Sequence, residues 1–179
     1  MHGHEILIGV TGGIAAYKTA ELVSRLVQAG AGVTVVMTRS ATELVGPRTF
    51  QSLTGRPVRV DMFETPEPFP HLEPARKAEL FCVAPATANI LAKAACGIAD
   101  DLVSTLLLAF TGPILFAPAM NVEMWKQPAV QRNIRQLTED GRHFIGPDAG
   151  RLACGDTGAG RMAEPEAIFE KIREVISDK

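Results

Sequence analysis

The sequence predicts an α/β fold: a single-domain, three-layer sandwich built on a parallel sheet of about six strands. Short apolar runs rich in β-branched residues alternate along the chain with segments whose apolar residues recur at helical spacing. The apolar runs are almost continuous, which is typical of strands buried on both faces of a parallel sheet. The length of 179 residues suits one domain that spans 1–179, because domains usually have about 100–200 residues.

In the first third of the chain, apolar runs predict the strands, and glycine or proline marks the helix ends. The first predicted helix stops at Gly30, and Pro47 opens the second, because proline is favoured in the first turn of a helix. The predicted elements are strands at Glu5–Val10 and Val33–Met37, helices at Ile14–Ala29 and from Pro47 to near Gly55, and at most a short strand at Val58–Val60.

The rest of the chain continues this alternation after a proline-rich segment. The stretch from Asp61 to Pro74 contains four prolines and is predicted to be a loop. The segment Leu102–Phe110 is apolar all round, which predicts a buried helix, with a subunit interface as one source of cover. The other predicted elements are strands at Leu80–Ala84, Ile114–Ala117 and His143–Ile145, an alanine-rich helix up to Gly97, a helix at Ala129–Asp140 and a final helix after Pro165.

Composition excludes several classes of protein. Apolar residues make up 46% and charged residues 21%, which rules out a disordered chain. The net charge of −2 provides no basic field for nucleic acid. The odd number of cysteines, three, with no CxxC spacing, argues against a disulfide framework or a metal site. Without a signal peptide or an apolar run near the roughly 20 residues that span a bilayer, we expect a cytoplasmic protein with no membrane partner.

The candidate site is predicted from the rule that ligands bind beyond the carboxyl ends of the strands of such sheets. After the first strand, Gly12 and Gly13 allow backbone N–H groups to approach an anion, although a merely tight turn explains them equally well. The second strand is followed by Thr38, Arg39 and Ser40, which offer two hydroxyls and a cation. Because neither GxGxxG nor GK[ST] is present, the pattern favours a mononucleotide over a dinucleotide or a P-loop ligand.

Two further strand ends carry small and polar side chains. Thr87 and Asn89 follow the strand at Leu80–Ala84 and suit a flat ring packed close to backbone, but Thr87 suits an ordinary helix N-cap as well. Asn121 follows the strand at Ile114–Ala117, beside Trp125, the only tryptophan. It is equally consistent with a packed loop and with an amide that binds a carboxylate.

The last strand is followed by a predicted glycine-rich loop, approximately 147–165, which we interpret as a mobile flap. Arg151 and Arg161 are available there for anionic groups of a substrate. Cys154 is the only cysteine outside the predicted strands and helices, and His71 precedes the strand at Leu80–Ala84 near the same edge of the sheet.

Four segments together give a resemblance that runs from about residue 6 to residue 176. They are TGGIAAYK (11–18), PATANI (85–90), PAMNVEMW (118–125) and RLACGDTGAGRMAEP (151–165). The chain resembles the homo-oligomeric flavin-containing cysteine decarboxylases, and within them the phosphopantothenoylcysteine decarboxylases. His71 stands where that family has its active-site histidine. Thr87 replaces the usual serine, and Ile90 replaces a threonine and lacks its hydroxyl.

The resemblance implies a flavodoxin- or Rossmann-like fold, FMN as the cofactor and 4'-phosphopantothenoylcysteine as the substrate. It implies catalysis by His71, as a base or electrostatic partner, and by Cys154, as the final proton donor. The remaining implied site residues are Met120, Asn121, Arg151, Leu152 and Ala153 for substrate, and Gly12, Gly13, Ile14, Thr38, Ser40, Thr87, Ala88, Asn89 and Ala119 for FMN.

The implied reaction converts the substrate to 4'-phosphopantetheine in coenzyme A biosynthesis. The thiol is oxidised to a thioaldehyde, CO₂ is lost, and the resulting enethiol is reduced. The alternatives are a peptidyl-cysteine decarboxylase that stops at the enethiol and a non-catalytic flavin-binding regulatory subunit. Relatives of this kind also imply a homotrimer or a dodecamer of trimers, and a phosphopantothenate–cysteine ligase that is separate or fused.

Overall fold

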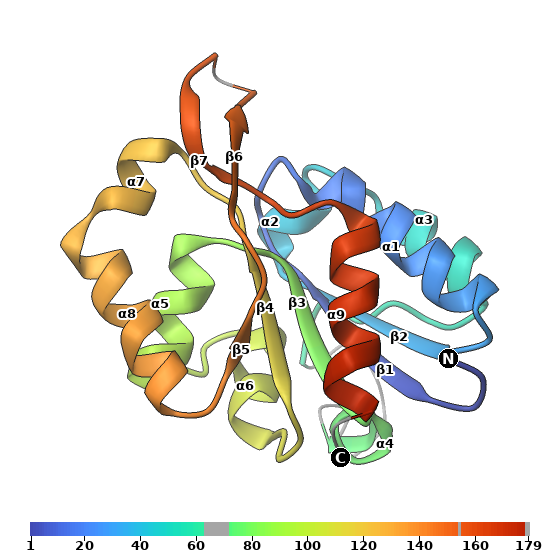
Figure 1. The fold of residues 1–179 in the computed structure, drawn as a ribbon. Coiled ribbons are helices and arrows are strands. Elements are labelled where there is room, and N and C mark those ends of the chain that lie inside the picture. The colour runs from blue at the N-terminus through green and yellow to red at the C-terminus, as the bar shows by residue number, and fades with distance from the viewer. Residues whose placement is uncertain (63–71, 154, 178–179) are drawn as a thin grey trace.

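The computed structural model describes residues 1–62, 72–153 and 155–177, without the side chains of residues 72–74. Its centre is a five-stranded sheet in which every neighbouring pair is parallel, with strand order β2-β1-β3-β4-β5 (Figure 1). The strands are β1 (Glu5–Val10), β2 (Gly32–Met37), β3 (Leu80–Ala86), β4 (Ile114–Pro118) and β5 (His143–Phe144). The predicted parallel sheet is therefore confirmed.

One predicted strand of that sheet is wrong. Val58–Val60 forms only an isolated parallel bridge, between Arg59 and Val36 at the edge of β2. Pro57 has no backbone N–H to donate, so the segment approaches the edge without extending the ladder. Five strands remain where about six were expected.

Helices cover both faces of the sheet, which gives the predicted three layers. On one face α1 packs against α3 and α9, and on the other α5 packs against α6 and α8 (Figure 1). The helices are α1 (Ala16–Gln28), α2 (Arg39–Thr42), α3 (Pro47–Thr54), α4 (Leu72–Lys77), α5 (Ala88–Cys96), α6 (Leu102–Ala109), α7 (Val122–Lys126), α8 (Pro128–Glu139) and α9 (Pro165–Ser177).

The core is divided by the sheet into two apolar clusters. Alternate residues of β1 supply both, because successive side chains of a strand point to opposite faces: Ile6 and Ile8 belong to the cluster under α1 and α9, and Leu7 to the one under α5 and α6. In the second cluster the rings of Phe81 and Phe110 meet edge to face, 5.9 Å apart. Because these strands are buried on both faces of the sheet, their sequences are almost continuously apolar.

Helix α6 is less buried than its composition predicted. Four of its leucine and valine side chains lie in the core, but Leu108 is 56% exposed. The helix begins with a capping box, in which the Asp101 carboxylate accepts from the Ser104 N–H at 2.8 Å. An apolar side chain therefore remains on the surface of a helix that is otherwise held firmly.

The glycine-rich segment forms a hairpin rather than a loop. Strands β6 (Asp148–Arg151) and β7 (Thr157–Arg161) pair antiparallel and project above the carboxyl end of the main sheet (Figure 1). The sequence did not predict three helical segments. Helices α2 and α7 are too short to show a helical pattern, and Pro74 obscured the first residues of α4. The predicted 61–74 loop is thus wrong from Leu72 onward.

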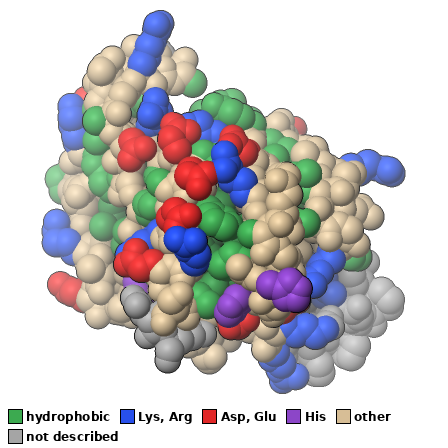
Figure 2. All heavy atoms as spheres, turned by 45° about the vertical axis from the view of Figure 1, so that its right-hand side comes forward, with side chains coloured by type: hydrophobic (Ala, Val, Ile, Leu, Met, Phe, Trp, Pro, Cys, Tyr) green, Lys and Arg blue, Asp and Glu red, His purple; other side chains and the backbone are tan. Residues whose placement is uncertain are grey.

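The surface carries no large field of one sign in the view of Figure 2, where acidic and basic side chains lie interleaved. Arg25 on α1, for example, pairs with Glu21 and with Glu166 of α9. Within the described residues, no helix is long and apolar enough to span a membrane.

Candidate functional site

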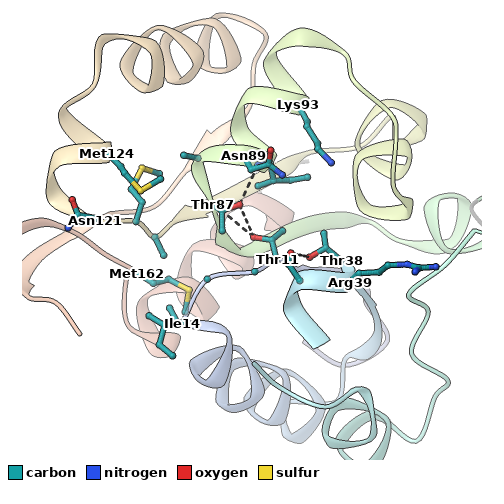
Figure 3. Close-up of a pocket in the computed structure, with 18 of the residues that line it drawn as sticks. Thr11, Ile14, Thr38, Arg39, Thr87, Asn89, Lys93, Asn121, Met124 and Met162 are labelled. Carbon is teal, nitrogen blue, oxygen red and sulfur yellow. Dashed lines mark hydrogen bonds between the residues drawn. The ribbon is translucent and has the colours of Figure 1, made fainter. Parts of the chain in front are cut away.

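A cavity of about 1200 Å³ lies at the carboxyl ends of β1 to β4, under the β6–β7 hairpin (Figure 3). It gathers segments that are far apart in the sequence, as the strand-end rule predicted. The described residues that the resemblance implied for substrate and cofactor all line this cavity: Gly12, Gly13, Ile14, Thr38, Ser40, Thr87, Ala88, Asn89, Ala119, Met120, Asn121, Arg151, Leu152 and Ala153. His71 and Cys154 lie outside the described residues.

The turn after β1 packs directly against the start of α2. A Cβ on Gly12 would lie 2.4 Å from Ser40 Oγ, so only glycine fits there. Ser40 Oγ is in turn 3.1 Å from Thr38 Oγ1, and Thr38 caps α2 by accepting from the Ala41 N–H. This corner of the cavity holds two hydroxyls beside the Arg39 guanidinium, which pairs with Asp61. Hydroxyls and a guanidinium are suitable donors for a phosphate.

A buried hydrogen bond joins the ends of β1 and β3. Thr11, which is 2% exposed, donates from Oγ1 to the Pro85 carbonyl at 2.6 Å and lies 3.3 Å from Thr87 Oγ1. Thr87 also accepts from the Ile90 N–H and so caps α5. The structural role considered for Thr87 is therefore present, and Figure 3 shows Thr87 between Thr11 and Asn89.

Asn121 connects the loop after β4 to the hairpin. Its Oδ1 accepts from the Glu123 N–H at 2.7 Å, which caps α7, and its Nδ2 donates to Asp156 Oδ2 at 2.9 Å. Asp156 lies between β6 and β7, 35 positions further along the chain. The amide faces the cavity, so a carboxylate ligand that bound it would compete with Asp156.

Several lining residues were not predicted to belong to the site. Lys93 lies one turn after Asn89 on α5 and bridges Asp100 and Asp101, with Nζ 2.6 Å from an oxygen of each. On the other side, Lys18 of α1 pairs with Glu164. Helical spacing from Asn89 would have placed Lys93 on the same face of α5, whereas no local signal connects Lys18 with Glu164.

Part of the cavity wall is apolar and open. Ile14, Tyr17 and Met124 are 63%, 62% and 47% exposed, although large apolar side chains are usually buried. A ligand with an apolar ring would cover them. The cavity exceeds the roughly 300–1000 Å³ of a typical small-molecule site, so it has room for more than one ligand.

A protein-family comparison shows which family the chain belongs to. The family model described as Flavoprotein matches residues 1–177. The chain belongs to the Flavoprotein family. A corner with two hydroxyls and a guanidinium, next to an open apolar wall, would suit the phosphate and the ring system of a flavin nucleotide, so the residues present fit such a cofactor.

Curated relatives of this flavoprotein are longer than the chain. The coenzyme A biosynthesis bifunctional protein CoaBC of Bacillus subtilis is 51% identical over 172 residues, which are 95% of this chain and 42% of that protein. CoaBC of Mycobacterium bovis is 46% identical over 164 residues, 92% of this chain and 39% of that protein. The chain thus spans less than half the length of these relatives.

Solved structures resemble the flavoprotein over almost its whole length. A cysteine-to-serine mutant of PPC decarboxylase, complexed with pantothenoylaminoethenethiol, superimposes with a TM-score of 0.85 at 31% identity and covers 96% of this chain and 97% of its own. The FMN-dependent cysteine decarboxylase SpaF has a TM-score of 0.84 at 32% identity, covering 98% and 97%. The FMN-binding protein AtHal3 has a TM-score of 0.84 at 31% identity, covering 98% of both chains.

Proposed function

We propose that this flavoprotein catalyses the FMN-dependent decarboxylation of 4'-phosphopantothenoylcysteine to 4'-phosphopantetheine in coenzyme A biosynthesis. The observation that carries the proposal is that a hydroxyl-rich corner, an open apolar wall and the Asn121 amide meet in one cavity. Relatives named for coenzyme A biosynthesis and structures named for PPC decarboxylase and FMN-dependent cysteine decarboxylation support it.

The FMN phosphate would be held by the backbone of Gly12 and Gly13 with the hydroxyls of Thr38 and Ser40. Its ring system would lie against the loop at the end of β3, with Ile14 as an apolar wall; Thr87, Ala88, Asn89 and Ala119 complete the proposed FMN set. Bound there, FMN supplies reversible two-electron redox chemistry. Its polar partners are few and its wall is largely apolar, as is usual for a cofactor site.

The substrate carboxylate would accept a hydrogen bond from Asn121 Nδ2, which now donates to Asp156. A cysteine carboxylate leaves as CO₂ only when a neighbouring C=S group accepts the electron pair, so the cavity must hold the carbon–sulfur end of the substrate firmly. Met120 and the β6 end at Arg151, Leu152 and Ala153 would enclose that end and exclude water.

Proton transfer is assigned to His71 and Cys154, on the resemblance of the sequence motifs. His71 would act as base or electrostatic partner during thiol oxidation. Cys154 would protonate the carbon next to the reduced centre at the end of the reaction, because a thiol with an ordinary pKa near 8.5 is a competent donor at neutral pH.

Assembly, compartment and pathway partners form the rest of the proposal. We propose a cytoplasmic homotrimer, or a homododecamer built from trimers, that works with a fused or separate phosphopantothenate–cysteine ligase. The half-exposed Ile98, in the connection between α5 and α6, and Leu108, near the end of α6, provide apolar surface for such contacts. Light scattering on the flavin-loaded protein tests the assembly, and a stable monomer with full activity would contradict it.

The deciding assay follows CO₂ release and the mass of the thiol product from 4'-phosphopantothenoylcysteine. The proposal expects CO₂ and the saturated thiol.

Cys154→Ser is expected to release CO₂ but to give an enethiol two mass units lighter, with bleached flavin under anaerobic conditions. His71→Asn is expected to keep flavin and lose about 10²–10⁴-fold in rate. A wild type that releases CO₂ only from cysteine-ending peptides would instead indicate a peptidyl-cysteine decarboxylase, and no turnover with flavin bound would indicate a regulatory subunit.

A further inference from the structure

The cavity has a second group of cations, on the side of α1 and the hairpin. Lys18 Nζ lies 2.9 and 3.0 Å from the two oxygens of Glu164, and Arg161 Nη2 lies 3.3 Å from one of them. Lys18 and Arg161 both line the cavity. One carboxylate thus serves two cations, which leaves the trio with a net charge of +1.

Arg161 has a donor that nothing satisfies. Its Nε is the one buried side-chain nitrogen or oxygen without a hydrogen-bond partner among the described residues. Because protein atoms enclose this nitrogen, it does not itself reach a ligand in the cavity. The rest of the guanidinium stays accessible, because the Arg161 side chain is 41% exposed.

The Arg161 side chain is held in place by its neighbours. A Cβ on Gly150, in the facing strand of the hairpin, would lie 3.4 Å from Arg161 Cζ and Nη1, so the guanidinium packs against this backbone. Lys18 is held as well, since its side chain is only 15% exposed although it carries a charge. Two immobilised cations on one wall of a cavity lose little entropy when they bind an anion.

We propose that Lys18 and Arg161 bind the phosphate of the phosphopantothenoyl substrate, with Glu164 as the counter-ion that sets their spacing. The inference rests on the proposed function and adds the determinant that selects a phosphorylated substrate. It assigns the two phosphate monoesters in the cavity to different places: the cofactor phosphate to the Gly12–Ser40 corner, and the substrate phosphate to the wall formed by α1 and the hairpin. Arg39, which pairs with Asp61, belongs to the corner assigned to the cofactor phosphate.

The test compares phosphorylated with dephosphorylated substrate, pantothenoylcysteine, on the flavin-loaded protein. Arg161→Met and Lys18→Met are each expected to raise KM for the phosphorylated substrate about tenfold or more, since a charged hydrogen bond is lost. With the dephosphorylated substrate, KM and kcat should match the wild type. Lys171→Met is the matched control, because Lys171 pairs with Glu174 on α9 and does not line the cavity.

Glu164→Gln tests the inference in the opposite direction. The amide keeps the size of the side chain and an oxygen that can accept from both cations, so their spacing should persist, while the negative charge that competes with the phosphate is lost. KM for the phosphorylated substrate is therefore expected to fall, and KM for the dephosphorylated substrate to stay unchanged. Arg161→Lys keeps the charge and removes the planar donor set, so it should fall between wild type and Arg161→Met. An equal loss on both substrates, or unchanged KM in Arg161→Met and Lys18→Met, would overturn the inference. So would flavin release from these variants, which would assign the cations to the cofactor phosphate.

A binding measurement separates this inference from the proposed reaction. Calorimetric titration of the flavin-loaded protein with 4'-phosphopantetheine and with pantetheine requires no turnover. The inference expects the phosphorylated ligand to bind more tightly to the wild type, and Arg161→Met to remove that difference. If CO₂ release fails while this difference persists, the proposed reaction is wrong and the phosphate site stands; if CO₂ is released and the wild type binds both ligands equally, the site is wrong.

Discussion

Met120 and Gly160 meet backbone to backbone, and this contact attaches the hairpin to the loop after β4. The Met120 N–H donates to the Gly160 carbonyl at 2.9 Å, and a Cβ on Gly160 would lie 2.3 Å from the Met120 oxygen. Gly160 also has φ of +150°, which L-residues with a side chain rarely adopt. The position of the hairpin over the cavity therefore depends on the absence of one side chain.

Gly160→Ala is expected to move the hairpin away from β4 and to lower the free energy of unfolding by about 1–3 kcal/mol, through the clash and the strained φ. CO₂ release should fall more steeply than flavin affinity, because the FMN corner lies on other elements. Denaturant unfolding and flavin titration measure the two effects. Gly150→Ala is the control for the unfolding measurement, since its Cβ would meet Arg161 at an ordinary 3.4 Å; an equal loss of stability in the two variants would contradict this explanation.

Asn121→Asp is expected to abolish most CO₂ release while flavin stays bound. Aspartate caps a helix as well as asparagine, so α7 should keep its start. The new carboxylate would face Asp156 and repel the substrate carboxylate, which Asn121 Nδ2 is proposed to bind. Steady-state kinetics should show a drop of about 100-fold or more in kcat/KM, since a favourable charged hydrogen bond becomes a repulsion. Wild-type turnover by the variant would remove Asn121 from substrate binding.

Stability at acid pH should depend on Glu5. Its hydrogen bond to Arg56, 2.9 Å from Nη2, holds the pKa of the Glu5 carboxyl below its usual 4.5. A carboxyl with a lowered folded-state pKa stabilises the fold above the unfolded pKa, and this stabilisation is lost as pH falls through the folded value. The melting temperature of the wild type should therefore fall more between neutral pH and pH values below about 4.5 than that of Glu5→Gln. Arg56→Gln should flatten the profile similarly, and parallel profiles for all three proteins would contradict the assignment.

The two described cysteines should differ in reactivity. Burial raises the pKa of the Cys82 thiol to about 12, whereas Cys96 is exposed at the end of α5. In a Cys154→Ser background, a chromogenic disulfide reagent at mild alkaline pH should modify Cys96 at once and Cys82 only after unfolding, because the thiolate is the reactive form. Cys96→Ser in the same background should abolish the fast phase. A fast phase that persists there would show that β3 opens readily.

The sequence predicted the strands better than the segments between them. Glu5–Val10 has the bounds of β1, since an apolar run buried on both faces is visible without tertiary information. The hairpin was interpreted as a loop because its glycines indicate turns, and its strands form only by pairing with each other, for example Gly150 with Gly158. Helix α7 was missed because it has only five residues.

The candidate site could be predicted because parallel strands bring their carboxyl ends to one edge of the sheet. This rule alone placed Gly12, Ser40, Thr87 and Asn121 near one another, and all four line the cavity. The sequence could not show whether these side chains have a structural role or a ligand-binding role. Thr87 and Asn121 cap helices as well as lining the cavity, so the two interpretations weighed for them are compatible. The pair of Lys18 with Glu164, 146 positions apart, has no local signature at all.

Helix α9 begins near the hairpin and runs toward the amino ends of the strands, so Ser177 lies on the side of the sheet remote from the cavity (Figure 1). A fluorophore or a biosensor surface coupled to a cysteine introduced at Ser177 would therefore lie away from the cavity. Small-molecule screening on an immobilised sample would leave the mouth of the cavity facing the flowing solution, and a dye placed there would report on tumbling without touching the ligands.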